Sequence, residues 1–526
     1  MPKKRKRAVS LALSCIFALL FFCEISFGEQ QATVAELFKK MTAAPTKEYI
    51  EFYHVGRDRR AIETKGTAIK EYTDVRESLL ARSVEVRRFS KHIIETSDDW
   101  RQQITARIIL GWLDHPQLYR DLWDWKIPNF IRWHNPIPFE QEAARHKFLQ
   151  AGRKAIPIML ELIWKKGQTY WGVLPQLLAE WKENASIPVI AESMTIYYPY
   201  DETITALGSF GEEATPYIID ALKKAEMYKS TAFIEALGLT GDEKAVPTLR
   251  YHLNESPYLE DREMAAVSLG RLNKFDEVRK SIPKAKPGEL GRFLRVLGRD
   301  HSKESRKLLY EYARKAESEH DRLAAVIAIL KEAMEEDIAT LCEIIPQEPH
   351  DYTRAGMYLY LSRPNNIQVR GALIKALNDK AKWPRIRAIE GLKYYDDEQT
   401  TNAVLAFAKP GNELSRNAIF MLKGRRSPAI AEAAIGLLED EDSEIQKYAA
   451  EALQANPTKK AFGPLVRLLD SEKIQVRLQA VRALAKIADK RAIPVLNEAL
   501  KKEEDSMVKD GIESGIRELL RHQQKR

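Results

Sequence analysis

The apolar positions between Lys473 and Leu500 follow the pattern of two short helices. From 476 to 487 the apolar residues fall along one side of an amphipathic helix. Residues 489–490 interrupt this pattern, and Pro494 then stands where a second helix would begin, a position at which its missing N–H costs nothing. One such pair cannot bury both of its apolar faces. The pattern therefore predicts neighbouring pairs of the same kind.

The same combination of a proline and a following apolar run recurs along the chain at intervals of roughly 30 residues. The long gap in the series, between the fourth and fifth prolines, corresponds to seven such intervals, and apolar runs without proline fall near each expected place. This period predicts about twelve two-helix repeats of roughly 31 residues. The prolines are Pro157, Pro188, Pro216, Pro247, Pro464 and Pro494, and the runs lie near Val278, Leu309, Ile338, Val369, Val404 and Ile435.

A second recurring signal is an arginine seven positions before a Leu or Ile, with small residues between them. Together with the period, it resembles the HEAT-repeat family over roughly residues 140–520, in particular the short bacterial-type units called phycobilin-lyase-like HEAT repeats. The resemblance implies an all-α fold, an α–α superhelix of the HEAT/ARM-like solenoid type. It also implies that these arginines form a structural ladder linking successive units through carboxylates, although a basic stripe for an anionic partner is the alternative. The arginines are Arg262, Arg322, Arg354, Arg385 and Arg477.

Residues 1–28 read as a secretory signal peptide. Residues 3–7 are all basic, residues 8–22 are apolar, and Ser26 and Gly28 provide the small residues of a cleavage site. We therefore expect an extracytoplasmic protein, periplasmic or secreted, with no transmembrane span after cleavage. Rival interpretations are a nuclear localisation signal at 2–7, an uncleaved anchor, and a lipoprotein attached at Cys23. The bacterial or eukaryotic origin of the host stays open.

The remaining chain divides by composition. We predict a helical N-terminal cap at 29–99, a tryptophan-rich helix and loop at 100–139, the solenoid at 140–505, and a capping helix with a polar tail at 506–526. Eight of the nine tryptophans lie between residues 100 and 181. Aromatic side chains in this loop are candidates for a platform that binds a sugar or peptide, or else they fill the junction between cap and solenoid. These candidates are Trp123, Trp125, Trp133 and His134.

Charge and cysteine content exclude several classes of function. Residues 1–28 carry five basic residues and one acidic residue, so the rest of the chain has 78 basic against 74 acidic residues. This near balance gives little reason to expect a nucleic-acid partner. Cys342 is the only cysteine after the signal peptide, so no intrachain disulfide can form there. Its place in an apolar stripe predicts a small buried hydrophobe.

The sequence offers no catalytic or cofactor-binding motif. It has no helical metal-ligand pair of histidines, no phosphate-binding glycine loop and no Gly-x-Ser-x-Gly. Deoxyhypusine hydroxylases of the HEAT type hold iron with His-Glu dipeptides, and this chain has none. We therefore predict that the protein is not an enzyme and needs no cofactor. The alternatives are an enzyme or enzyme subunit with a site in the tryptophan-rich region, and a carbohydrate- or envelope-binding module using the same aromatics.

An acidic residue follows three consecutive repeat prolines by four positions, at Glu161, Glu192 and Asp220. If the second helix of each repeat lines the concave side, these acids form an exposed row there. Such a row would attract a basic segment of a partner, and its reversal to lysine would leave the fold intact. We therefore expect an exported scaffold that binds a protein partner through its concave surface.

Overall fold

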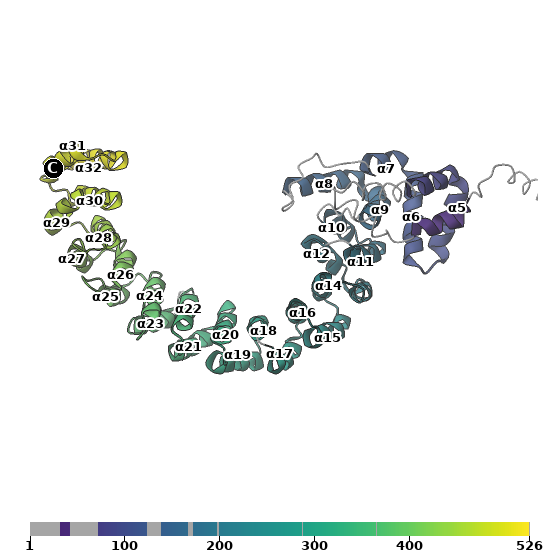
Figure 1. The fold of residues 1–526 in the computed structure, drawn as a ribbon, viewed down its shortest axis with the longest axis horizontal. Helices are drawn as coiled ribbons and strands as arrows, with labels where there is room; N and C mark the ends of the chain where they lie inside the picture. The colour runs from purple at the N-terminus through teal and green to yellow at the C-terminus, as the bar shows by residue number, and fades with distance from the viewer. Residues whose placement is uncertain are drawn as a thin grey trace, which may run out of the picture. The chain divides into compact units, whose positions relative to one another are not determined.

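The computed structural model describes residues 32–42, 72–123, 138–166, 172–196, 199–286, 288–363 and 366–524, and all of its regular secondary structure is helical. The chain divides after Leu272 into two compact units, each of which is a stack of helical pairs (Figure 1). The predicted fold class, an all-α superhelix of the HEAT/ARM type, is therefore confirmed.

The first unit begins with helices that stand outside the repeat. Phe38 and Phe89 meet there with ring centroids 5.2 Å apart, which joins the first of these helices to a later one. The helices are α2 (Val34–Thr42), a helical stretch at 72–81, α5 (Ser83–Thr96), α6 (Trp100–Asp114) and α7 (Pro116–Trp123). The repeated pairs follow as α8 (Pro138–Ala151) with α9 (Ile156–Lys166), α10 (Val173–Glu180) with α11 (Ile187–Ile196), α12 (Asp201–Ser209) with α13 (Thr215–Leu222), α14 (Met227–Leu239) with α15 (Val246–Glu255), and finally α16 (Leu259–Arg271).

The second unit continues the same alternation and ends in a longer helix. After α17 (Phe275–Ser281) its pairs are α18 (Leu290–Leu297) with α19 (Lys303–Lys315), α20 (Glu319–Lys331) with α21 (Glu335–Ile344), α22 (Asp351–Leu361) with α23 (Ile367–Ala376), α24 (Lys382–Leu392) with α25 (Glu398–Leu405), α26 (Ser415–Leu422) with α27 (Pro428–Leu437), α28 (Ser443–Ala455) with α29 (Phe462–Arg467), and α30 (Ile474–Ile487) with α31 (Ala492–Lys502). The last helix is α32 (Ser506–Gln524).

The repeat prolines begin helices, as their positions predict. Pro216 and Pro247 occupy the first or second position of α13 and α15, where a missing N–H leaves no helical hydrogen bond unmade. Short 3-10 turns lead into several of these helices, for example η1 (Gly152–Ala155), η2 (Asn184–Ser186), η4 (Glu243–Ala245) and η7 (Lys459–Ala461). The apolar residues after each turn are buried between the two helices of the pair.

From α8 onward, even-numbered helices are the first helices of the repeats and odd-numbered helices the second, and each set packs against its own kind. Small residues allow successive even-numbered helices to approach closely. A Cβ at Gly238 would lie 2.5 Å from Cβ of Ser268, and a Cβ at Gly298 would lie 2.4 Å from the carbonyl oxygen of Ala328. Within the second unit, Figure 1 shows the even-numbered helices on the inner side of the bend.

Candidate partner-binding surface

The three acids predicted to form one exposed row lie in three different environments. Glu161 is completely buried, Glu192 is mostly buried, and only Asp220 is exposed, with 59% of its side chain accessible. The expectation that all three positions are exposed is therefore wrong. Its cause is α6, which packs on α9 from the N-terminal side, so that Gly111 leaves no room for a Cβ against Pro157.

Glu161 accepts hydrogen bonds from two aromatic side chains outside the repeats. The indole Nε1 of Trp112 donates to Oε2 at 2.8 Å, and the hydroxyl of Tyr72 donates to Oε1 at 2.5 Å. These charge-assisted hydrogen bonds satisfy a carboxylate that burial would otherwise penalise severely. Glu161 thus joins the first full repeat to the helices that precede it.

Lys165 lies one helical turn after Glu161 and is also buried. Its Nζ stands 3.5 Å from the ring centroid of Trp164, a cation–π distance. Burial lowers the pKa of Lys165 to about 7, while the nearby carboxylates of Glu161 and Glu192 act in the opposite direction. A lysine of this pKa is a competent nucleophile, but its burial denies access to a substrate. The network is therefore best understood as packing of the N-terminal helices onto the first repeat.

Glu192 and Asp220 pair with basic side chains of their own unit. Arg101 lies 3.0 Å from Glu192, and Lys224 lies 2.5 Å from Asp220. Both acids line a small cavity of about 150 Å³ together with Trp100. In the second unit the first helices of the repeats, which are even-numbered, line the inner side of the bend (Figure 1).

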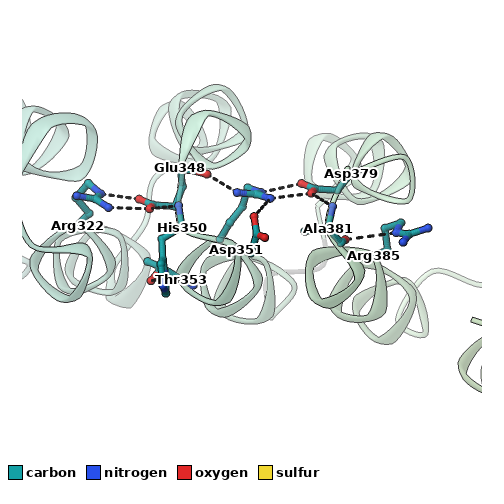
Figure 2. A network of polar contacts seen from close by, with 9 residues as sticks. Arg322, Glu348, His350, Asp351, Thr353, Asp379, Ala381 and Arg385 are labelled. Carbon is teal, nitrogen blue, oxygen red and sulfur yellow. Dashed lines mark hydrogen bonds and ion pairs between the residues drawn. The ribbon is translucent and has the colours of Figure 1, made fainter. Parts of the chain in front are cut away.

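The arginine ladder is used in contacts between repeats. Arg322 donates from Nε and Nη2 to both oxygens of Glu348, at 2.6 and 2.8 Å (Figure 2). Arg354 binds Asp379 in the same bidentate way, with both distances 2.8 Å. Each acid stands in the loop before the next even-numbered helix. The guanidinium therefore ties one repeat to the start of the following one.

The other members of the ladder vary this arrangement. Arg477 donates to both oxygens of Glu503 at 2.7 and 2.8 Å, and these bonds lower the pKa of that carboxyl. Arg385 pairs with Glu413, and Arg262 donates to the carbonyl of Ser256 at 2.8 Å. The partner acids were not predicted from the sequence. Their signal was an acidic residue 25 or 26 positions after the arginine, at Glu348, Asp379 and Glu503.

Aromatic side chains bridge neighbouring even-numbered helices of the second unit in two pairs. Tyr352 of α22 and Trp383 of α24 have ring centroids 5.9 Å apart and exposed fractions of 66% and 43%. The ring centroids of Phe420 in α26 and Tyr448 in α28 are 4.9 Å apart. Phe420 is exposed and Tyr448 is half-buried. Nζ of Lys423 lies 4.5 Å from the Phe420 centroid and 4.9 Å from the Tyr448 centroid. We call these four aromatic residues the aromatic face. Because large exposed aromatics are unfavourable in water, their pairing on adjacent repeats indicates a contact surface.

The tryptophan-rich loop lies mostly outside the described residues. Trp123 ends α7, but its side chain is not among those the structure describes, and Trp125, Trp133 and His134 are outside the described ranges.

Cys342 is half-buried in α21, and burial raises the pKa of its thiol to about 11. Its thiol is therefore a poor nucleophile at neutral pH.

The described ranges contain neither a candidate metal cluster nor a membrane-spanning helix. No cluster of three or more His, Cys, Asp or Glu side chains there is arranged to hold a metal ion. Among the same residues, no helix combines the length and apolar character needed to cross a bilayer.

A family model described as HEAT repeats matches residues 430–517, from α27 into α32. In this part the chain is therefore similar to HEAT repeats. No curated protein sequence matches the chain. Because the family match covers the C-terminal repeats alone, the fold of the other repeats rests on their own helices and contacts.

Several solved structures resemble the chain at low identity. Kap121p has a TM-score of 0.47 and 12% identity, and the match covers 84% of this chain and 54% of Kap121p. Kap95p in a structure with RanGDP has a TM-score of 0.41 and 10% identity, covering 93% of this chain and 67% of Kap95p. The structure of a Kap95–Nup1 complex has a TM-score of 0.36 and 11% identity, and the match covers 93% of this chain and 68% of that chain. The chain thus spans about half the length of Kap121p.

Proposed function

We propose that the protein is a non-catalytic repeat scaffold that binds a protein partner across the even-numbered helices of its second unit. The observation that carries the proposal is the aromatic face, in which Tyr352, Trp383, Phe420 and Tyr448 are paired between adjacent repeats. Tyrosine and tryptophan are enriched among the residues that dominate protein–protein binding energy, because they bury large areas at low entropic cost.

The other candidate surfaces are less suited to this role. In the ladder, Arg322 and Arg354 donate hydrogen bonds to acids of neighbouring repeats. Glu161 accepts hydrogen bonds from Trp112 and Tyr72. A partner would have to break these contacts before it could use them. The aromatic face, by contrast, is largely exposed and keeps its ring pairs in place on rigid helices, so little order is lost on binding.

Replacing Tyr352 and Trp383 by serine is expected to weaken partner binding by more than about tenfold, because the pair forms one contact spanning α22 and α24. The measurement is the affinity of the purified variant for a partner captured with the wild-type protein, with cross-linking and mass spectrometry to locate the contact. Both residues are exposed, so the helical content and melting temperature are expected to stay close to wild type.

Tyr394→Ser is the matched control. Tyr394 is as exposed as the paired rings and lies in the same unit, just after α24, but belongs to neither pair. Its replacement should leave the affinity within twofold of wild type. Equal losses in control and double variant, or cross-links confined to the odd-numbered helices, would contradict the assignment.

We also propose that the scaffold acts outside the cytoplasm, after cleavage of residues 1–28. The support is the run of basic residues at 3–7, the apolar segment at 8–22 and the small residues at Ser26 and Gly28. N-terminal sequencing of protein from the native host should begin at Glu29 or within a few residues of it. A chain that keeps Met1 and stays in the cytosol or nucleus would exclude export.

A further inference from the structure

A groove of about 750 Å³ lies between α19 and the start of α21 in the second unit. It belongs to the odd-numbered helices and is separate from the aromatic face. Its lining carries five basic side chains and three acidic ones, so its formal charge is positive. A groove of this size accommodates a small organic molecule.

Arg306 lines the groove and is only 5% exposed. Its Nη2 donates to the carbonyl of Glu332 at 2.9 Å and lies 3.3 Å from Nδ1 of His301. Its Nε and Nη1 find no hydrogen-bond acceptor among the described residues. The contrast with Arg322 is direct, since that guanidinium engages a carboxylate through two nitrogens. Arg306 therefore holds two buried donors without a protein acceptor in the wall of the groove.

The acid beside Arg306 is held in place by hydrogen bonds within the protein. Asp337 is buried, lies 3.5 Å from Nη2 of Arg306, and accepts hydrogen bonds from the Tyr310 hydroxyl and from the backbone N–H of Met334 at 2.8 Å. Burial, together with this bond to Asp337, raises the pKa of Tyr310 to about 12, so the hydroxyl remains a donor. Asp337 is thus held by donors from α19 and from its own helix start.

The rim adds cations that have no ion-pair partner among the described residues. Lys303 and Lys307 are exposed on the same face of α19, and Lys315 lies near its end. None of the three has an ion-pair partner among the described residues, whereas many exposed lysines of this chain, such as Lys224 and Lys460, do. Charges left unpaired around a concave surface raise the local concentration of anions.

We propose that this groove binds a small phosphorylated molecule, with its phosphate at Arg306 and Lys303 and Lys307 at the rim. Arg presents planar donors suited to phosphate oxygens, and lysines add point charges around them. The volume exceeds that of a single phosphate ion, so the remaining space, beside Tyr310 and Met334, is available to the rest of the molecule.

The test uses the full chain with inorganic phosphate and pyrophosphate as probes, and sodium chloride at equal ionic strength as the blank. Calorimetry measures the affinity, and amide hydrogen exchange locates protection to α19 and α21. We expect binding that Lys303→Gln/Lys307→Gln weakens about tenfold. Lys380→Gln/Lys409→Gln removes the same charge from exposed sites elsewhere in the unit and should change the affinity less than twofold.

Arg306→Met should abolish binding of both probes, because it removes the guanidinium at which we place the phosphate. If this variant fails to fold, the rim variants still test the proposal. Binding of pyrophosphate but not phosphate would indicate that a larger phosphorylated molecule is required, which supports the groove as the site. The proposal is overturned if neither probe binds beyond the chloride blank, or if both lysine pairs weaken binding equally.

Discussion

Replacing Glu161 by lysine is expected to unfold the N-terminal part of the first unit. The change removes the acceptor for the Trp112 indole and the Tyr72 hydroxyl and places a second cation beside the buried Lys165. Loss of one partner from a buried charged network costs about 3–5 kcal/mol, and the added charge increases that cost. Amide hydrogen exchange should show loss of protection in α6 and α9.

Asp220→Lys is the matched control, because Asp220 occupies the same place after its repeat proline but is exposed and pairs with the exposed Lys224. Its reversal should change the free energy of unfolding by no more than about 0.5 kcal/mol. Similar stabilities for the two variants would contradict the burial of Glu161. From sequence alone both changes would be expected to be harmless.

The pH dependence of stability provides an independent check on this network. The pKa of Lys165 falls from 10.5 to about 7 on folding, so between these values the unfolded chain binds the proton that the folded chain has released. Stability of the first unit should therefore rise as pH increases from about 7 towards 10.5, by up to about 1.4 kcal/mol per pH unit. Lys165→Met should remove this rise. A variant with an unchanged slope would show that another group is responsible.

Replacing Arg354 by alanine is expected to destabilise the second unit by about 3–5 kcal/mol. Its side chain is 2% exposed and donates to Asp379, Asp351 and the carbonyl of Glu348. Truncation therefore leaves the mostly buried Asp379 and the Glu348 carbonyl without this donor. Chemical denaturation followed by circular dichroism measures the loss. Hydrogen exchange should place it at α22 and α24, where the guanidinium joins the two repeats.

Arg385→Ala tests whether the loss of stability expected for Arg354→Ala depends on the position in the ladder or on the burial of the side chain. Arg385 lies one repeat further on, but its side chain is 23% exposed and its partner Glu413 is 46% exposed. An ion pair in that environment contributes less than about 1 kcal/mol, because water screens it. A loss as large as that of Arg354→Ala would mean that the ladder acts through something other than burial.

The sequence alone was sufficient to predict the repeat architecture. Proline at a helix start, apolar residues at helical spacing and a regular period are local properties, and each repeat must meet the same packing requirement as its neighbour. For this reason Pro216, Pro247 and the helices α30 and α31 occur where the pattern placed them. The arginine spacing likewise marked positions that contact the next repeat, at Arg322, Arg354, Arg385 and Arg477.

Only the tertiary structure decided which of these regular positions are exposed. Glu161 and Asp220 are equivalent in the repeat, but α6 covers Glu161, and that helix stands outside the period. The aromatic face was not predicted from the sequence, because Tyr352 and Trp383 belong to successive repeats. Only the packing of α22 on α24 brings their rings together. A periodic sequence specifies how each repeat meets its neighbours, whereas exposure depends on what else packs against that repeat.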